Sequence, residues 1–325
     1  MKKRICCFIL AFILIAICQA GCGKKDNGMK KVVLNEVAHS IFYAPQYVAI
    51  EMGYFKDAGI DLVLETGFGA DKTMTALISG NADIGFMGSE STIYAYAEGS
   101  KDYAVNFAGL TQRAGNFLVA REKIDNFSWD MVKGKNVLGG RKGGMPQMVL
   151  EYILKANNID PASDLSIDQS VDFGLTAGAF SGNTEYDFTV EFEPGATSLE
   201  KEGKGYVVAS LGVDSGYVPY TAYSAKKSYI EKNPEIIKDF TSAIQKGLDY
   251  VNSHSSAEIA KVIAPQFEDT DIDTITTIVE RYKSQDTWKK DTVFTRESFD
   301  LLEDILIEAG ELKEKVPYED LVKVD

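Results

Sequence analysis

Cysteine and histidine are scarce in this chain of 325 residues. The two histidines, His39 and His254, lie far apart in the sequence. All four cysteines lie near the N-terminus: Cys6, Cys7, Cys18 and Cys22. Beyond Cys22 the chain therefore cannot form a disulfide within itself, and a metal site built from histidine and cysteine is excluded.

Several enzyme motifs are also missing. The sequence has no GxSxG nucleophile elbow, no HExxH zinc-binding motif and no GxxxxGK[ST] phosphate loop. Gly67, Phe68 and Gly69 look like the start of a dinucleotide-binding loop, but Lys72 stands where its third glycine would be. We interpret that segment as a strand-to-helix turn. The sequence predicts no cofactor and no enzymatic activity.

Positive charge is in short supply. The chain has 34 Lys and Arg against 48 Asp and Glu, a formal net charge of -14. Nucleic-acid binding needs clustered basic residues, and anionic lipid headgroups would repel so acidic a surface. We therefore expect no nucleic-acid partner and no peripheral membrane-binding surface.

The N-terminus has the pattern of an export signal. Lys2, Lys3 and Arg4 precede the apolar run from Ile5 to Ile17, which is too short for the roughly 20 residues of a membrane-spanning helix. The sequence Gln19-Ala20-Gly21-Cys22 then resembles the bacterial lipoprotein signal, with Gln19 at a position that usually holds Leu. That resemblance implies a signal peptide over residues 1–21 and a lipid on Cys22. Residues 22–30 would then tether the protein to the outer face of the cell membrane. The alternative is a secretory signal that merely contains cysteines.

After the tether, short apolar runs alternate with helical patterns, which predicts an α/β fold with largely parallel sheets. Predicted strands are Val32–Leu34, Ile60–Leu64, Ile84–Met87, Phe117–Ala120, Asn136–Leu138, Phe188–Val190, Val207–Ala209 and Tyr220–Ser224. Predicted helices between them are Tyr43–Met52, Asp71–Ser79, Gln147–Asn157 and Pro194–Lys201.

From Asn233 onward the pattern is helical only. We expect helices at Pro234–Ser253, Ser256–Ile263, Asp273–Gln285 and Arg296–Ala309, the last capped by Thr295. These helices are predicted to pack on the first α/β unit and not to form a third domain.

A glycine-rich loop, Gly139–Pro146, precedes the helix predicted from Gln147. Its four glycines would let the backbone approach a ligand closely, and Arg141 and Lys142 add positive charge. A solvated surface turn explains this segment equally well, so its context must decide.

That context comes from three further segments: residues 39–45 before the stretch Gly53–Ile60, residues Gly80–Gly85, and Phe192-Glu193-Pro194. The sequence A-x-E-x-GYFKDAGI at Ala49–Ile60, followed by SGNADIGF at 79–86, is a rather specific signature. With the glycine loop, these segments resemble the periplasmic-type binding proteins for thiamine pyrimidine precursors, sulfonates, taurine and nitrate. The resemblance covers roughly residues 32–251.

The resemblance implies a periplasmic binding protein-like type II fold of two α/β lobes. Lobe 1 would comprise residues 31–118 and 222–325, and lobe 2 residues 119–221. The crossing strands, which serve as the hinge, would be Leu118–Arg121 and Tyr220–Ser224. Such proteins are monomers that capture a small solute and deliver it to the permease of an ABC importer.

Carried over by position, the ligand contacts come from loops at strand ends, where open parallel sheets bind ligands. The expected ligand-binding residues are His39, Phe42, Tyr43, Phe68, Asp71, Ser89, Glu90, Gly143, Gly144, Met145, Phe180, Glu191 and Glu193. Some have structural alternatives: Phe42 and Tyr43 as core residues, His39 as a loop histidine with satisfied hydrogen bonds, and Glu193 as a helix cap.

The charge of the expected binding residues narrows the range of expected ligands. The sulfonate-binding members carry small hydroxyl residues in the glycine loop, where this chain has Gly143-Gly144-Met145. Glu90, Glu191 and Glu193 would repel an anion, whereas a neutral or cationic heterocycle could bond to them and stack on Phe42, Tyr43 or Phe180. We therefore favour a thiamine pyrimidine precursor or a similar amine over sulfonate, taurine or nitrate. The rival functions are a pyrimidine-synthase-like enzyme on the same fold and a sensor that docks on a membrane receptor.

Overall fold

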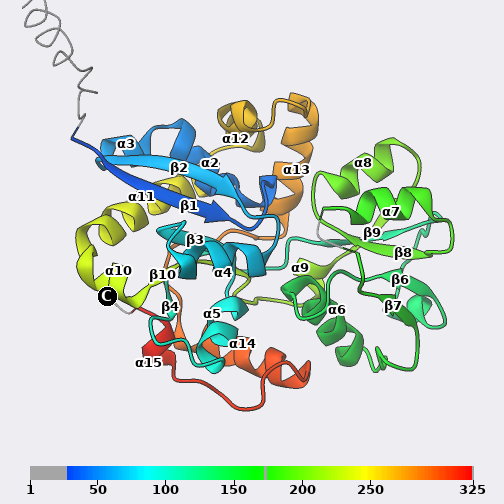
Figure 1. Cartoon of the computed structure of the whole chain (residues 1–325). Coiled ribbons are helices and arrows are strands. Elements are labelled where there is room, and N and C mark those ends of the chain that lie inside the picture. The colour runs from blue at the N-terminus through cyan, green and yellow to red at the C-terminus, as the bar shows by residue number, and fades with distance from the viewer. Residues whose placement is uncertain (1–27, 172–173, 324–325) are drawn as a thin grey trace, which may run out of the picture.

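Two five-stranded sheets organise the chain (Figure 1), and we call the unit around each sheet a lobe. The structure is a computed structural model that describes residues 28–171 and 174–323. The predicted signal peptide and Cys22 lie outside the described residues, as does most of the predicted tether.

The sheet of lobe 1 has the order β2-β1-β3-β10-β4. Its strands are β1 (Lys30–Glu36), β2 (Ile60–Thr66), β3 (Ile84–Gly88), β4 (Ala104–Thr111) and β10 (Thr221–Lys226). β1, β2 and β3 are parallel, with Leu34 opposite both Leu64 and Ile84, whereas β10 runs antiparallel to β3 and β4. The carboxyl ends of the parallel strands therefore meet at one edge.

The sheet of lobe 2 has the order β7-β6-β8-β5-β9. Its strands are β5 (Phe117–Ala120), β6 (Asn136–Leu138), β7 (Ser166–Asp168), β8 (Phe188–Glu191) and β9 (Tyr206–Ser210). β6, β7 and β8 are parallel, and β5 is antiparallel to both of its neighbours. Each lobe thus combines a parallel part with an antiparallel part, so the expectation of largely parallel sheets holds for three strands of each.

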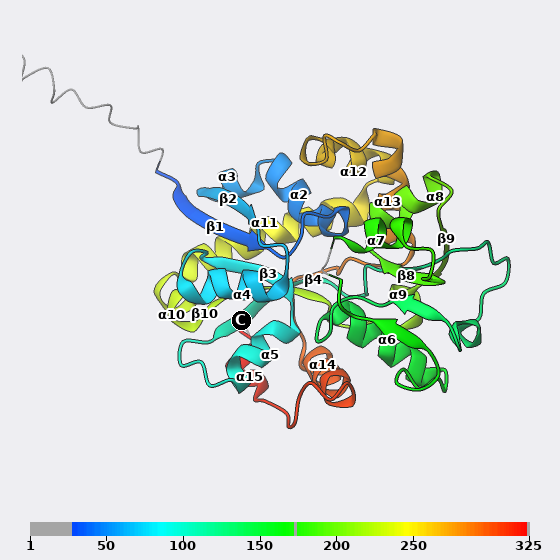
Figure 2. The same cartoon turned by 45° about the vertical axis from the view of Figure 1, so that its right-hand side comes forward.

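Helices flank both sheets (Figure 2). Those that precede lobe 2 in the chain are η1 (Ile41–Tyr43), α2 (Ala44–Glu51), α3 (Tyr54–Asp57), α4 (Ala70–Ser79) and α5 (Glu90–Ala97). Lobe 2 contains η2 (Trp129–Val132), α6 (Met145–Ala156), α7 (Thr176–Gly182), α8 (Gly195–Lys201) and α9 (Leu211–Asp214). The remainder are α10 (Lys227–Lys232), α11 (Pro234–Ser253), α12 (Ser256–Ile263), η3 (Ala264–Gln266), α13 (Ile272–Ser284), α14 (Arg296–Glu308) and α15 (Tyr318–Leu321).

The long helix α11 packs its apolar face on lobe 1. Ile237, Phe240, Ile244 and Leu248 recur at helical spacing and are buried. Gly247 lets α11 lie close to α2, because a Cβ at this position would come within 2.1 Å of the Pro45 carbonyl oxygen. The packing of α11 thus depends on the absence of one methyl group.

Two connections join the lobes, and they differ from the predicted crossing strands. The sequence predicts crossings at Leu118–Arg121 and Tyr220–Ser224, but β5 pairs along its whole length inside the sheet of lobe 2. β10 likewise lies within the sheet of lobe 1. The chain crosses just before these strands, through 112–116 and 215–220. The predicted boundary at residue 118 falls inside β5.

The C-terminal helices do not all stay on lobe 1. α11 and α12 pack on α2, as expected, whereas α14 contacts α6 of lobe 2 as well as α5. In α13, Tyr282 donates to the Gly115 carbonyl oxygen, and Arg281 pairs with Glu193 and Glu200 of lobe 2. Helices that follow lobe 2 in the chain therefore help to join the two lobes.

Most elements match the sequence-based predictions. The helices at Pro234–Ser253 and Ser256–Ile263 are confirmed to the residue, and Thr295 caps α14 by accepting from the Ser298 N–H. β4 and β7 were not predicted from the sequence. β4 has no polar-apolar alternation to reveal it, because all eight of its residues, Asn106 included, are buried.

Candidate functional site

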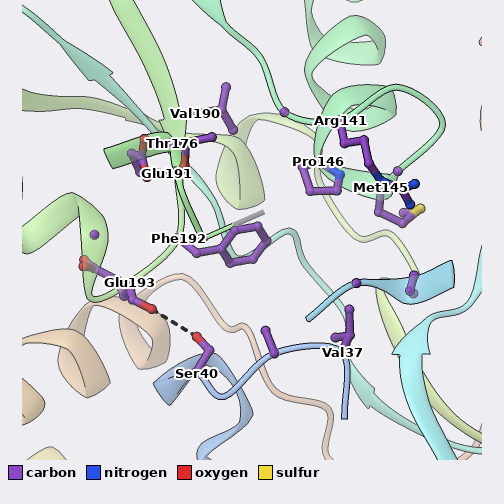
Figure 3. A pocket seen from close by; sticks show the side chains of 18 of the residues that line it. Val37, Ser40, Arg141, Met145, Pro146, Thr176, Val190, Glu191, Phe192 and Glu193 are labelled. Atoms are coloured by element: carbon purple, nitrogen blue, oxygen red, sulfur yellow. Dashed lines mark hydrogen bonds between the residues drawn. The ribbon is translucent and has the colours of Figure 1, made fainter. Parts of the chain in front are cut away.

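A cavity of about 390 Å³ lies between the lobes (Figure 3). Lobe 1 supplies residues that follow β1 and β3, and lobe 2 supplies residues that follow β6 and β8. These are the carboxyl ends of parallel strands, where loops can converge on a ligand without interrupting the sheet. The cavity is large enough for a small organic molecule.

Much of the cavity wall is apolar or aromatic. Tyr43 and Tyr220 line it from lobe 1 and its connection to lobe 2. Figure 3 shows the Phe192 side chain extending into the space between Pro146 and Val37. Flat aromatic side chains in such an arrangement offer stacking surfaces to a planar ligand.

Glu90 brings a buried carboxyl group to the cavity from lobe 1. It is the first residue of α5, only 2% of its surface is exposed, and its Oε2 has no hydrogen-bond partner among the described residues. Burial raises the pKa of Glu90 to about 7, because the charged form loses solvation; its own N–H, the Arg141 guanidinium and the Met145 N–H act in the opposite direction. Glu90 can therefore accept a further hydrogen bond.

Glu191 brings a second buried carboxyl group from lobe 2. It ends β8, and it accepts hydrogen bonds from Thr189 at 2.6 Å and Thr176 at 2.9 Å. Burial raises the pKa of Glu191 to about 7, the two threonine hydroxyls lower it, and nearby Glu193 raises it further. Two carboxyl groups that titrate near neutrality thus line one cavity, one on each lobe.

Glu193 is engaged within the protein. Its carboxylate accepts from the Thr197 N–H and hydroxyl, each at 2.9 Å, and lies 2.5 Å from Arg281 Nη1. Its backbone carbonyl accepts from Ser40 Oγ at 3.1 Å, the dashed bond in Figure 3. Glu193 therefore caps the first turn of α8 and links the lobes, which is the structural role that the sequence analysis left open.

His39 is also satisfied by protein partners. Its Nδ1 lies 2.8 Å from Glu36 Oε1 and its Nε2 lies 2.8 Å from the Gln266 carbonyl oxygen. The hydrogen bond to Glu36 raises the pKa of His39, burial lowers it, and the Gln266 carbonyl adds to the increase. Because both ring nitrogens face acceptors, the geometry suits a protonated ring at the edge of the cavity.

The structure places only some of the predicted ligand-binding residues around the cavity. Those in its lining are His39, Tyr43, Glu90, Gly144, Met145, Glu191 and Glu193. The lining does not include Phe42, Phe68, Asp71, Ser89, Gly143 or Phe180.

Burial explains the absence of Phe42 and Phe180 from the lining. Both side chains are fully buried. Phe42 packs against Tyr43 and Phe192, and Phe180 lies beneath the Arg121 guanidinium. Phe42 is thus a core residue, the alternative left open by the sequence. Phe180 belongs to the interior of lobe 2, so neither ring offers a free face for stacking.

Other predicted residues lie near the cavity without lining it. Phe68 is 68% exposed, Ser89 donates to the Pro219 carbonyl oxygen, and the Gly143 N–H donates to the Gln147 side chain. Asp71 pairs with Arg141 at 3.4 Å, from lobe 1 to lobe 2. This exposed pair lies across the cleft.

The lining also includes residues that were not predicted to bind the ligand, among them Phe192, Tyr220 and Arg141. Signals existed for two of them, because Phe192 lies in the Phe-Glu-Pro segment and Arg141 in the glycine loop. The sequence held no such signal for Tyr220. It lies in the connection that returns the chain to lobe 1, and only the path of that connection brings it to the cavity.

The family of the chain follows from comparison with known proteins. Residues 41–257 match the family described as NMT1/THI5 like. The chain belongs to the NMT1/THI5-like family. A relative from Bacillus subtilis (strain 168), named "Putative binding protein YtlA", is 46% identical over 322 residues, covering 99% of this chain and 95% of the relative.

Solved structures of the same fold include two binding proteins. The alkanesulfonate-binding protein SsuA of Xanthomonas axonopodis pv. citri, bound to MOPS, has a TM-score of 0.73 at 14% identity and covers 90% of this chain and 98% of its own. The nitrate-binding protein NrtA of Synechocystis PCC 6803 has a TM-score of 0.62 at 16% identity over 76% of this chain and 69% of its own. These likenesses confirm the predicted periplasmic binding protein-like α/β fold.

Neither a metal cluster nor a spanning helix is found in residues 28–171 and 174–323. No three His, Cys, Asp or Glu side chains of this part gather closely enough to hold a metal ion. None of its helices combines the length and apolar character needed to cross a bilayer.

Proposed function

We propose that this family member is an extracytoplasmic solute-binding protein of an ABC importer and that its ligand is a small heterocycle or amine. A thiamine pyrimidine precursor is the favoured example. The observation that carries the proposal is that two buried carboxyl groups, Glu90 on lobe 1 and Glu191 on lobe 2, line one mainly apolar cavity. Ligand N–H groups can donate to these carboxyl groups, and a planar ring can stack on Phe192.

Binding would act by lobe closure. A ligand that contacts Glu90 on lobe 1 and Glu191 on lobe 2 has more contacts when the lobes are together, so it stabilises the closed state by that difference in affinity. No covalent bond changes in this process. We therefore propose a carrier and not an enzyme, with the permease as the protein partner and a monomer as the working form.

The decisive experiment is a thermal-shift screen followed by calorimetry. The panel contains a hydroxymethyl aminopyrimidine, riboflavin, polyamines, taurine and an alkanesulfonate. A ligand at 100 times its dissociation constant should add about 2.7 kcal/mol to the unfolding free energy. Stabilisation by taurine or alkanesulfonate alone would contradict the ligand class.

The two carboxyl groups can be tested directly. The double variant Glu90→Gln/Glu191→Gln should weaken amine binding by roughly tenfold or more, because hydrogen bonds to charged groups contribute about 1.5–3 kcal/mol each. Glu303→Gln is the control, since Glu303 is a buried glutamate outside the cavity lining whose carboxylate accepts from the Val316 N–H. Equal affinity in the double variant and the control would refute the assignment of the site.

An anionic ligand is the second candidate. It is favoured by one observation, the N-terminus of α6, where Gly144 and Met145 line the cavity and no side chain caps the helix. Sulfonate, taurine or nitrate could bind at such a helix end. The same calorimetric panel distinguishes this candidate.

The membrane anchor is proposed from the sequence. A lipid on Cys22 would hold the protein beside its permease, since two or more acyl chains give stable anchoring. Cys22→Ser should release the protein from the membrane fraction, and mass spectrometry of the wild-type N-terminus should show the acylated cysteine. An unmodified Cys22, or a mature N-terminus elsewhere, would refute the anchor.

A further inference from the structure

The helix α6 presents an uncapped N-terminus to the cavity. Its N-cap residue is Gly144, which has no side chain to accept from the first turn, and its second residue is Pro146. The Gln147 side chain is turned back to the Gly143 N–H and to Glu151. The N-terminus of this 12-residue helix carries a partial positive charge that faces the cavity. No side chain in the described part of lobe 2 caps the helix and neutralises that charge.

Glu90 supplies the missing negative charge from the other lobe. The N–H of Met145, the first residue of α6, and the Arg141 guanidinium both favour the ionised form of Glu90, so they lower its pKa against the larger opposing effect of burial. Glu90, Gly144 and Met145 line the same cavity, so the structure places a carboxyl group of lobe 1 beside the N-terminus of this helix of lobe 2.

Gly88 leaves room for the Glu90 carboxyl group. The carboxyl group of Glu90 lies over Gly88, where a Cβ would come within 2.2 Å of Oε2 and 2.5 Å of Oε1. Only glycine leaves this space open. Oε2 remains buried without a hydrogen-bond partner in the described part of the chain, although Glu90 is only 2% exposed. An unpartnered buried carboxylate oxygen requires a donor.

We propose that Glu90 determines ligand specificity: its carboxylate takes the place of an anion at the N-terminus of α6, and its Oε2 accepts from an N–H group of the ligand. This inference rests on the proposed solute-binding function and adds the residue that selects the ligand charge. The proposal predicts that a sulfonate does not bind at this helix end, because the Glu90 carboxylate supplies the negative charge there, and it therefore argues against the anionic second candidate.

The test measures anion binding by calorimetry at pH 8, with ethanesulfonate and sulfate as probes. The variants are Glu90→Gln, which keeps the shape of the side chain, and Glu90→Ala. The matched control is Glu191→Gln, because Glu191 is a carboxyl group of the same cavity whose two oxygens already have threonine partners. Glu191→Gln removes one negative charge from the cavity, as Glu90→Gln does, but leaves Glu90 in place at the N-terminus of α6.

Both Glu90 variants should bind ethanesulfonate roughly tenfold or more tightly than the wild type, the change expected from one charge-assisted hydrogen bond of about 1.5–3 kcal/mol. Glu191→Gln should gain much less. An equal gain in the control, no gain in either Glu90 variant, or tight binding of ethanesulfonate by the wild type would overturn the proposal.

The wild-type measurement needs no variant, so the proposal stays testable if a substitution impairs folding. Its failure is also separable from that of the solute-binding function. If the wild type binds an amine but the Glu90 variants do not gain anion affinity, only the role of Glu90 is refuted. If the wild type binds nothing in the panel, the solute-binding proposal itself fails, and the role of Glu90 fails with it.

Discussion

The ion pair between Arg281 and Glu193 offers a sharp test of how the lobes are held together. Arg281 extends from α13, and its Nη1 lies 2.5 Å from Glu193 Oε1 while its Nη2 lies 2.9 Å from Glu200 Oε2. The Glu193 side chain is fully buried and that of Arg281 is 25% exposed. Removal of Arg281 would leave a buried carboxylate without its cation.

Breaking a buried pair in this way costs about 3–5 kcal/mol. Because the Thr197 N–H and hydroxyl still donate to Glu193, we expect Arg281→Met to lose about 3 kcal/mol of unfolding free energy, the lower end of that range. Glu193→Gln should cost less, since Arg281 keeps Glu200. The double variant should cost less than the sum of the two by about 1 kcal/mol or more.

The assay is urea unfolding of the ligand-free protein at pH 7, with X-ray scattering to detect separation of the lobes. The control is Lys204→Met, which removes an exposed pair between Lys204 and Glu202 and should change stability by less than about 1 kcal/mol. If Arg281→Met is as stable as the control, or if the double variant shows strict additivity, the pair does not join the lobes as described.

Two further predictions concern pH and packing. Burial raises the pKa of Glu90 and of Glu191 from 4.5 to about 7. Between pH 4.5 and pH 7 the folded protein therefore binds more protons than the unfolded chain. Its unfolding free energy should fall as pH rises through this range, by roughly 3 kcal/mol for each group. Urea unfolding at pH 5 and pH 8 checks this, and Glu90→Gln/Glu191→Gln should flatten the dependence; an unchanged slope would contradict it. Gly247→Ala should destabilise by about 2 kcal/mol or more because its Cβ meets a carbonyl oxygen, whereas Gly178→Ala in α7, with open space around it, should be neutral or stabilising by up to about 1 kcal/mol. Equal melting temperatures for these two variants would refute the close approach of α11 to α2.

Much of the architecture was predictable from local patterns. The helices beyond Asn233 have regular apolar spacing and clear caps, and these are local properties of the sequence. The glycine loop together with the segments at 39–45, 49–60, 79–86 and 192–194 indicated the family that the comparison then showed. The misplaced crossings have a physical reason as well, because an apolar run reveals a strand but not the sheet to which it belongs.

The candidate site was predictable only in outline. Strand ends identify the loops that converge, but they do not reveal which side chains in those loops already have partners. Glu193 and Glu90 are alike in sequence, yet Arg281, 88 residues further along the chain, engages the first, and Oε2 of the second lacks a partner in the described part of the chain. Aromatic residues are equally ambiguous, since Phe42 and Phe180 are buried while Phe192 extends into the cavity.

The sequence by itself thus determined the scarcity of cysteine and histidine, the order of most strands and helices, and the family, because each depends on residue type and spacing along the chain. Only the tertiary structure decided the rest: where the chain crosses between the lobes, which glutamates are engaged, and the presence of Glu90 and the N-terminus of α6 in one cavity. These features depend on contacts between segments far apart in sequence, and burial then sets the pKa of each carboxyl group.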